Sequence, residues 1–400
     1  MRRDVFTRLP IFACAALIAA LFAANLWNFA VGSEWPKLRI RSAEPLWGVP
    51  GPRPVPWTLD DFLSGETQKA FSTGVGQSMP VFPIAVRAKN QFLYSVFSAS
   101  GAPDIVVGKE RQLFENFYVQ EFCARGGVSD PKAIDEWAGR VRDIQTAVEA
   151  KGKRFVYLIS PSKAARYSRY LPAYAPCPSV RTGTTEKLAP YRAALDSRGV
   201  TYVDGASLIS AAMPEYSINL FPRGGTHWNY LGSAITVREL SHALNKDGKA
   251  SPMPLYDFDW REKEEAQGTD RDLLNLLNLL KPDARYPTAA VAGRNEGSCA
   301  AAPKILAVGG SFLVEIVTNL VEAPCSASVD YWHYIRTAPG KFSRMRLLAD
   351  RQDGLREHRV ETDEDFEKSF ANAQVVLLEE NEAVIANMGQ VPDLLAAAAK

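Results

Sequence analysis

The chain has 400 residues, a charged fraction of 23% and a formal net charge of +1. A chain of this length can hold one large domain or two ordinary ones. Its hydrophobic fraction of 46% is typical of a globular protein. The near-neutral charge balance gives no indication of a nucleic acid partner, because domains that bind nucleic acid are usually strongly basic.

Three arginines among the first eight residues precede an apolar run over residues 9–31. This run is just long enough to span a bilayer, and the basic flank favours a cytoplasmic N-terminus. A signal peptide cleaved near residue 23 is the alternative. We favour an uncleaved anchor because the apolar run continues through Trp27. We therefore predict a cytoplasmic stub over residues 1–8, a transmembrane signal anchor over residues 9–31 and export of the remainder.

Residues 32–58 are rich in proline and tryptophan, which predicts an extended linker. From Thr58, a candidate helix cap, hydrophobic periodicity indicates helices at 59–63, 82–97, 131–151, 186–197, 229–244, 270–280 and 311–323, and a last one at 394–400. Short apolar runs predict strands at 104–107, 154–159, 201–204, 304–308, 328–334 and 374–378. We expect residues 251–268 to be irregular. This alternation predicts an α/β fold with a mostly parallel sheet.

The strand at 304–308 leads directly into Gly309, Gly310 and Ser311, and a predicted helix follows. Strand, glycine turn, serine and helix form the pattern of a nucleophile elbow. Glycines allow a sharp turn, and free backbone N–H groups there can stabilise an oxyanion. We therefore predict Ser311 as a nucleophile, with backbone groups at Gly309 and Gly310 in the oxyanion site.

A nucleophilic serine needs a base, which is usually a histidine. The chain has four histidines, and only His227 stands in a glycine-rich loop before an amphipathic helix. We therefore predict His227 as the base. Lys163 follows the strand at 154–159, at the edge where open α/β sheets bind ligands, and is a candidate substrate contact. Further candidates for stacking on a sugar ring are Trp228, Tyr331, Trp332 and Tyr334.

The part of the chain after the apolar run contains four cysteines. An even number in an exported protein indicates two disulfides, with three possible connectivities. We favour Cys299–Cys325, which closes the strand and helix around Ser311, and this leaves Cys123–Cys177. The cysteine spacing does not suit zinc, and we predict neither a metal nor a cofactor.

Several short stretches together resemble the alginate O-acetyltransferases of the AlgJ and AlgX type, in the same order along the chain. They include Asn90 with residues 94–97, then residues 106–114, 161–163, 226–228, 272–273, 309–312, 375–378 and 381–382. The resemblance covers nearly all of the chain after the apolar run. It implies an SGNH-hydrolase-like, three-layer α/β/α acetyltransferase domain over residues 59–400, with Ser311 and His227 in the positions of the family's serine and histidine.

The resemblance also implies partners and a location. We expect a periplasmic protein anchored in the bacterial inner membrane, a polysaccharide acceptor and an acetyl donor supplied through a membrane-bound O-acyltransferase. The leading hypothesis is an O-acetyltransferase that works through an acetyl-enzyme on Ser311. A carbohydrate acetylesterase is one alternative, and a non-catalytic polysaccharide-binding or scaffold protein of an exopolysaccharide machinery is another.

The chain departs from the family at position 225, where an aspartate is typical and Gly225 stands here. Such an acid fixes the tautomer of the histidine and stabilises its charged form. Three possibilities follow: another group orients His227, a Ser–His dyad works at a reduced rate, or the domain binds polysaccharide without chemistry. Candidates for the orienting acid are Asp204, Asp270 and Asp272.

Overall fold

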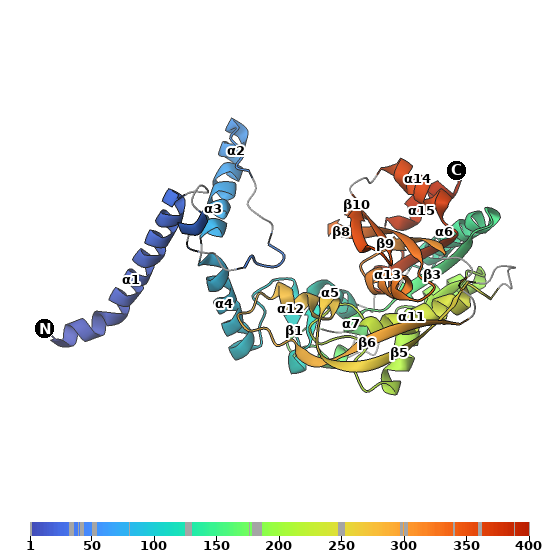
Figure 1. Cartoon of the computed structure of the whole chain (residues 1–400), viewed down its shortest axis with the longest axis horizontal. Helices are drawn as coiled ribbons and strands as arrows, with labels where there is room; N and C mark the ends of the chain where they lie inside the picture. Colours follow the sequence, from blue (N-terminus) through green and yellow to red (C-terminus); the bar gives the residue numbers. More distant parts are fainter. Residues whose placement is uncertain are drawn as a thin grey trace. The chain divides into compact units, whose positions relative to one another are not determined.

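The structure of the chain is a computed structural model (Figure 1). It describes residues 2–31, 36–38, 40, 44–49, 54–79, 81–124, 130–175, 177, 186–246, 253–296, 299, 303–338, 341–358, 362–387 and 389–399. The chain forms two compact units: Met1–Pro103 with Leu274–Asp283, and Asp104–Leu273 with Ala284–Lys400. Parts of the predicted linker, namely residues 32–35, 39, 41–43 and 50–53, lie outside the described residues.

The first unit is helical. Its elements are α1 (Arg2–Val31), the 3-10 turn η1 (Pro36–Leu38), α2 (Leu59–Ser64), α3 (Glu66–Ser78) and α4 (Phe82–Phe97). Residues Arg8–Asn28 of α1 are long and apolar enough to cross a membrane. Thr58 caps α2 by accepting a hydrogen bond from the N–H of Asp61, as the sequence predicts, and Gly65 ends this helix at a positive φ of 86°.

Part of the predicted linker contacts the rest of the first unit. The backbone N–H of Trp47 donates to the side chain of Asn278 at 2.8 Å, and the Asn278 amide donates back to the carbonyl of Trp47 at 3.0 Å. Asn90 of α4 donates to the carbonyl of Leu277 at 2.8 Å. Two buried asparagines therefore tie the segment Leu274–Asp283 into this unit.

The second unit is built on a seven-stranded sheet in the order β10-β9-β8-β7-β11-β3-β4. The strands from β8 to β4 are parallel to their neighbours, and β9 and β10 are antiparallel. The bounds are β3 (Arg154–Ser160), β4 (Tyr202–Asp204), β7 (Lys304–Gly309), β8 (Ser328–Ala338), β9 (Lys341–Asp350), β10 (Gly354–His358) and β11 (Val375–Asn381). The sheet confirms the predicted mostly parallel α/β architecture.

Helices cover both faces of this sheet because its central strands are apolar on both sides. In β3, Phe155, Tyr157 and Ile159 pack into one core, and Val156 and Leu158 into another. The first core includes α6 (Pro131–Ala150), α9 (Ala189–Ser197), α14 (Asp363–Asn372) and α15 (Gln390–Ala399); α6, α14 and α15 lie together in Figure 1. The second core includes α11 (Tyr230–Ala243) and α13 (Leu313–Glu322). The unit thus has three layers.

Shorter elements complete the second unit. Strands β1 (Ile105–Val107) and β2 (Leu113–Glu115) form a small antiparallel hairpin. The remaining helices and 3-10 turns are η2 (Lys109–Arg111), α5 (Asn116–Ala124), α7 (Lys163–Arg166), η3 (Ser168–Tyr170), α10 (Gly205–Ala212), η4 (Met213–Glu215), η5 (Gly268–Arg271) and α12 (Asp272–Leu276), of which α12 crosses the boundary between the units.

Two predictions between residues 251 and 296 are wrong. Residues 251–268 are not irregular, because β5 (Leu255–Glu265) pairs with β6 (Arg285–Glu296) in a long antiparallel hairpin. The predicted helix over 270–280 is only the short α12. Asn278 has a positive φ of 48°, a left-handed conformation that asparagine tolerates and that a helix cannot continue through.

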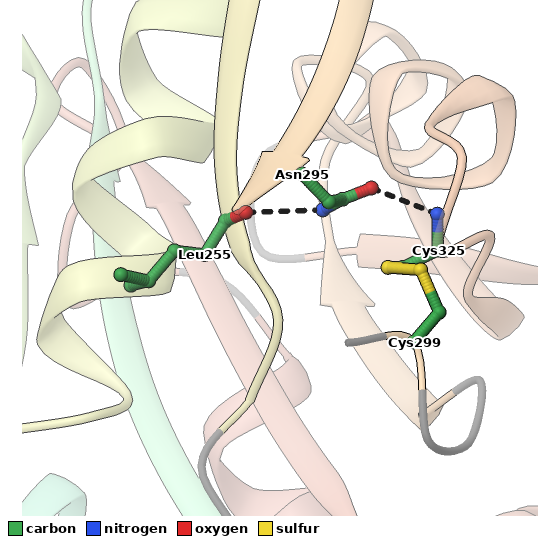
Figure 2. The surroundings of a disulfide bond; sticks show 4 residues. All are labelled: Leu255, Asn295, Cys299 and Cys325. Carbon is green, nitrogen blue, oxygen red and sulfur yellow. Dashed lines mark hydrogen bonds between the residues drawn. A yellow bond between two sulfur atoms is a disulfide. The ribbon is translucent and has the colours of Figure 1, made fainter. Parts of the chain in front are cut away.

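Both favoured disulfides, Cys123–Cys177 and Cys299–Cys325, are present. Figure 2 shows how Asn295, near the end of β6, lies against the second of these. The Asn295 side chain accepts a hydrogen bond from the N–H of Cys325 at 2.8 Å and donates to the carbonyl of Leu255 at 3.2 Å. The β5–β6 hairpin is thereby joined to the segment that follows α13.

Candidate active site

The turn that carries Ser311 follows β7 at the carboxyl edge of the sheet, where open α/β sheets bind ligands. Helix α13 begins at Leu313, so Ser311 lies in the turn before the helix and not, as predicted, at its first position. Gly309 is required here, because a Cβ at this position would lie 2.5 Å from the Glu379 carboxylate. The hydroxyl of Tyr331 donates to the carbonyl of Gly310 at 2.6 Å and holds the turn from β8.

Three side chains form a hydrogen-bonded chain. His227 Nε2 lies 2.7 Å from Ser311 Oγ, and His227 Nδ1 lies 2.6 Å from Asp272 Oδ2. The other oxygen of Asp272 accepts from the backbone N–H of Thr226 at 3.0 Å and from its neighbour Leu273. When the histidine is neutral with its proton on Nδ1, Nδ1–H donates to Asp272 and Nε2 accepts a hydrogen bond from the Ser311 hydroxyl. Of the three possibilities, the geometry supports orientation of His227 by another acid, since Asp272 completes a hydrogen-bonded Ser–His–Asp chain.

The other two candidate acids are placed elsewhere. Asp204 caps α10 by accepting from the N–H of Ser207 at 3.0 Å, and it pairs with Arg192 at 3.2 Å. Asp270 is fully buried and accepts a hydrogen bond from the Thr288 hydroxyl. Burial raises the pKa of Asp270 to about 6 despite that hydrogen bond. Neither carboxylate contacts His227, so both candidates are wrong.

Packing explains why position 225 carries no acid. A Cβ on Gly225 would collide with the carbonyl oxygen of Thr269 and lie 2.9 Å from the ring of Pro222. The backbone of Thr269 and Asp270 thus fills the space that a side chain at 225 would need. The same segment leads into Asp272, which reaches His227 from 45 residues further along the chain.

Lys163 holds the loop that carries His227. Its ammonium donates to the carbonyls of Pro222 at 2.6 Å, Arg223 at 3.2 Å and Gly225 at 2.8 Å. The side chain is 2% exposed, and burial lowers the pKa of Lys163 to about 7, although the charge of Asp272 opposes this shift. All three ammonium hydrogens have acceptors, so the prediction that Lys163 contacts substrate is wrong.

The predicted sugar-stacking aromatics are buried, with exposed fractions of at most 3%. Trp228 donates to the carbonyl of Phe312 at 3.1 Å, and Trp332 donates to Ser369. Tyr331 holds the serine turn, and Tyr334 donates to Asp393 at 2.6 Å. Of these four, only Tyr334 lines the cleft described next. Their hydrogen-bonded and packed positions overturn the stacking prediction.

Ser311 opens into a cleft with about 1390 Å³ of empty volume, part of it open solvent. Part-exposed aromatic rings on its wall include Phe117, Tyr118 and Phe342, and the charged side chains on it are Asp104, Glu115 and Arg336. The cleft also contacts His333, next to β7 in the sheet, and burial lowers the pKa of His333 to about 4. Sequence reasoning did not identify the wall residues Asp104, Glu115, Phe117, Tyr118, Arg336 and Phe342, because they come from separate loops and strands.

Of the two glycines predicted at the oxyanion site, Gly310 is engaged elsewhere, because its N–H donates to Glu379 Oε2 at 2.6 Å. Gly309 ends β7 and lies opposite His333 of β8 in the sheet. Glu379 also accepts from the Ser160 hydroxyl. Burial raises the pKa of Glu379 to about 7 against these hydrogen bonds. Glu379 thus positions the serine turn; its place at the carboxyl end of a buried strand was a sequence signal for such a role.

Carboxylates around His227 determine its charge. Burial by itself lowers the pKa of His227, but the hydrogen bond and charge of Asp272, with the charges of Glu315 and Glu115, raise it to about 9. Glu315 lies four residues after Ser311 on α13 and is fully buried. Burial raises the pKa of Glu315 to about 7, while His227 opposes the shift. The site therefore stabilises the imidazolium that forms when His227 takes a proton.

Among the residues that the structure describes, no three histidine, cysteine, aspartate or glutamate side chains gather in a way that could hold a metal ion. The hydrogen-bonded serine, histidine and aspartate are the arrangement that activates a hydroxyl for acyl transfer.

A three-layer α/β unit with a Ser–His–Asp chain at the carboxyl edge of its sheet defines the class of serine-dependent acyl-transfer and hydrolase folds. The sequence model described as "SGNH hydrolase-like domain, acetyltransferase AlgX" matches residues 105–321, which is more than half of the chain. The chain belongs to this family, as its sequence resemblance predicts.

A curated relative is the probable alginate O-acetylase AlgJ of Pseudomonas putida, which is 22% identical over 184 residues. That match spans 46% of this chain and 45% of the relative, so the chain spans less than half the relative's length. Solved structures with a similar chain include the O-acetyltransferase domain of Pseudomonas putida AlgJ (TM-score 0.43, 18% identity, 74% of this chain and 99% of that one). Another is Pseudomonas aeruginosa AlgX, with a TM-score of 0.42 and 14% identity, covering 72% of this chain and 65% of that one.

Proposed function

We propose that the protein is an O-acetyltransferase that adds acetyl groups to hydroxyls of an extracytoplasmic polysaccharide through an acetyl-enzyme on Ser311. The observation that carries this proposal is the continuous hydrogen-bonded chain from Ser311 through His227 to Asp272, open to a cleft. Membership of an acetyltransferase family supports transfer of an acetyl group as the reaction.

In the proposed first step, neutral His227 takes the proton of Ser311 as the serine oxygen attacks the carbonyl carbon of the acetyl donor. Asp272 stabilises the imidazolium that results. We propose that the backbone N–H of Ser311, which makes no hydrogen bond to the described residues, holds the oxyanion. His227 then gives its proton to the leaving oxygen, and the acetyl ester remains on Ser311.

In the second step, a sugar hydroxyl enters where the leaving group departed. His227 removes its proton, the sugar oxygen attacks the acetyl ester, and Ser311 regains its proton from His227. Water in the same position would give an acetylesterase, so the bound sugar must exclude water. The non-catalytic scaffold alternative was motivated by Gly225, and the position of Asp272 removes that motive.

We further propose a periplasmic location, with α1 as an anchor in the bacterial inner membrane and residues 59–400 containing the catalytic domain. Two disulfides suit an oxidising compartment, and Arg8–Asn28 can span a bilayer. Because a curated relative is a probable alginate O-acetylase, we propose that acetyl groups arrive through a membrane-bound O-acyltransferase and pass to a polysaccharide of the same compartment.

Peptide mapping by mass spectrometry tests this proposal. The full chain in detergent is incubated with an activated acetyl ester, alongside Ser311→Ala and His227→Ala. We expect one acetyl group on the peptide that contains Ser311, absent in the first variant and strongly reduced in the second, and its transfer to added polysaccharide. Folded wild-type protein that gains no acetyl on Ser311 would refute the mechanism, and release to water alone, with polysaccharide present, would identify an esterase.

A further inference from the structure

We propose that the acceptor is a sugar polymer free of acidic groups, and that the cleft discriminates against polyuronates. This inference rests on the proposed function, because it concerns what enters the cleft beside Ser311. It departs from the chemistry of alginate, which carries a carboxylate on every sugar.

The first observation is a pair of carboxylates on the wall of the cleft. Asp104 immediately precedes β1, and Glu115 ends β2, directly opposite Ile105 in the hairpin register. The backbone keeps this arrangement, since the N–H of Asn116 donates to the carbonyl of Asp104 at 2.8 Å. Both side chains line the same cleft as Ser311.

The second observation is that little fixed positive charge compensates these carboxylates: His227, whose pKa is raised to about 9, is charged at rest near neutral pH but is neutral when it acts as the base. Neither Asp104 nor Glu115 forms an ion pair with a lysine or arginine in the described part of the chain. Among the described residues that line the cleft, Arg336 is the single lysine or arginine, and its guanidinium lies over the ring of Phe117 at 4.5 Å. His333 adds no charge near neutral pH, because burial lowers its pKa to about 4.

These charges oppose a polyanion. Two carboxylates face one guanidinium, and Asp272 adds a further negative charge behind His227 when that histidine is neutral and able to act as a base. A uronate bound next to Ser311 would bring its own carboxylate toward this wall, in a cleft where charges are screened less than on an open surface. The wall instead offers the part-exposed rings of Phe117, Tyr118 and Phe342, which suit the apolar faces of uncharged sugars.

The donor can report on this preference, because the leaving group and the acceptor oxygen occupy the same position in the two half-reactions. The test therefore uses three aryl acetates whose leaving groups are neutral, anionic (4-acetoxybenzoate) and cationic (a trimethylammonium-substituted phenyl acetate). Each rate of Ser311 acetylation is divided by the rate of hydroxide hydrolysis of the same ester, which removes differences in intrinsic reactivity.

We expect the normalised rate for the anionic ester to be at least tenfold below that for the neutral ester, and the cationic ester to react at least as fast as the neutral one. The ratio of the normalised rate for the neutral ester to that for the anionic ester should fall several-fold in the double variant Asp104→Asn with Glu115→Gln. The matched control, Glu136→Gln with Glu364→Gln, removes two exposed carboxylates from helices and should leave the ratio unchanged. Added salt should lower this ratio of rates in the wild type, because salt screens the repulsion between the ester and the carboxylates; this measurement needs no variant.

The second arm presents the acetyl-enzyme with a β-linked glucuronate oligomer and with its C6 methyl ester, which has the same hydroxyl groups but no charge. Faster transfer to the methyl ester is expected. A wild-type preference for the anionic ester, a ratio that neither salt nor the double variant alters, or equal or faster transfer to the glucuronate would overturn the inference. Failure of every ester to acetylate Ser311 would instead refute the proposed function itself, so the two failures are distinguishable.

Discussion

At the scale of single residues, the site depends on Asp272, which is far from His227 in the sequence. The backbone just before Asp272 packs against Gly225 and so places the Asp272 side chain beside His227. Asp272 meets His227 at 2.6 Å, while Gly225 leaves room for the backbone of Thr269 and Asp270. The two features belong together, because the segment that excludes a side chain at 225 is the one that brings in the acid. Asp272 therefore orients the imidazole of His227 from a position 45 residues further along the chain.

Because of this packing, we predict that an aspartate at position 225 cannot replace Asp272. Asp272→Ala should lower the rate of Ser311 acetylation by about 10²–10⁴-fold, the usual cost of losing the third member of a triad. Adding Gly225→Asp should give no recovery, because the new side chain collides with the carbonyl of Thr269, and it should also lower the free energy of unfolding by about 1–3 kcal/mol.

Burst kinetics of Asp272→Ala and of the double variant with Gly225→Asp measure the rate of Ser311 acetylation, and thermal unfolding of the same variants measures the change in stability. Recovery of more than tenfold in the double variant, with unchanged stability, would show that position 225 still accepts an acid and would contradict the packing argument.

The sequence could predict Ser311 and His227 because a glycine turn after a strand and a glycine-rich loop before a helix are local patterns. It could not choose among Asp204, Asp270 and Asp272, since the choice depends on a contact across 45 residues. The aromatic predictions failed for a related reason: residue type alone does not tell whether a ring faces the core or a cleft.

At the scale of elements, two loops from different strands are fixed by buried polar side chains. Lys163, which begins α7, binds three carbonyls of the loop that leads to His227. Glu379 of β11 binds the N–H of Gly310 in the loop that carries Ser311. The 2.7 Å contact between the serine and the histidine therefore rests on two anchors outside the triad.

Lys163→Met tests the first anchor. The substitution retains most of the apolar stem but leaves three carbonyls of the loop without their donor, so we expect a loss of about 2–5 kcal/mol in the free energy of unfolding. The rate of Ser311 acetylation in the remaining folded protein should fall at least tenfold. Lys132→Met, at an exposed position on α6, is the matched control and should change neither quantity. Normal activity in folded Lys163→Met would mean that the loop holds its shape without the ammonium.

The disulfide Cys299–Cys325 anchors the β5–β6 hairpin and the end of α13, as Figure 2 shows. Replacing both cysteines by serine should lower the free energy of unfolding by about 3 kcal/mol, as expected for a closed loop of 26 residues. Denaturant unfolding, with and without reductant, measures the effect. If reductant destabilised the double variant as much as the wild type, Cys123–Cys177 would be the bond responsible.

Elements with strong local patterns were predicted well, and long hairpins were not. The strand β5 does carry an alternating pattern, with Tyr256 and Phe258 buried between exposed or half-exposed acids, but its many charges made the segment read as irregular. The leucine-rich run after Asp270 reads as a helix, yet it is divided between the two units and ends at the left-handed Asn278.

At the scale of the molecule, the second unit buries acids in the core beside its sheet. Glu315, Glu379 and Glu380 are each 0% exposed, and burial raises the pKa of each to about 7, although hydrogen bonds to Glu379 and Glu380 and nearby His227 oppose the shift. A raised pKa means that the folded state favours the protonated form of each acid. The contribution of each protonated acid to the free energy of unfolding is complete below pH 4.5 and is lost as the pH rises through 7.

The protein should therefore lose stability between pH 5 and pH 8. Glu380 accepts hydrogen bonds from Trp137 at 2.8 Å and Tyr157 at 2.9 Å. Glu380→Gln keeps an acceptor for them and removes the titration, so it should reduce this loss by about 3 kcal/mol. Denaturant unfolding at several pH values provides the comparison. An identical pH dependence in the variant would show that Glu380 titrates normally in the folded protein.

The layered architecture was predictable because β3, β7 and β11 are apolar on both faces, and such strands belong to the centre of a parallel sheet. The antiparallel edge could not be predicted, because β9 and β10 mix charged and apolar residues and their place depends on the pairing of β9 with β8. The extent of the sheet is thus a tertiary property.

In the proposed mechanism, neutral His227 activates Ser311, while Asp272 orients the imidazole and raises its pKa. The most direct measurement is the single-turnover rate of Ser311 acetylation between pH 5 and pH 10, in the wild type and in Asp272→Asn. Only neutral His227 can act as the base, so the wild-type rate should rise with pH and level off with an apparent pKa above the ordinary 6.5 and near 9. Asp272→Asn removes a charge that raises this pKa, so its slower reaction should level off at a lower pH. A rate independent of pH, or the same pH profile in both proteins, would contradict this mechanism.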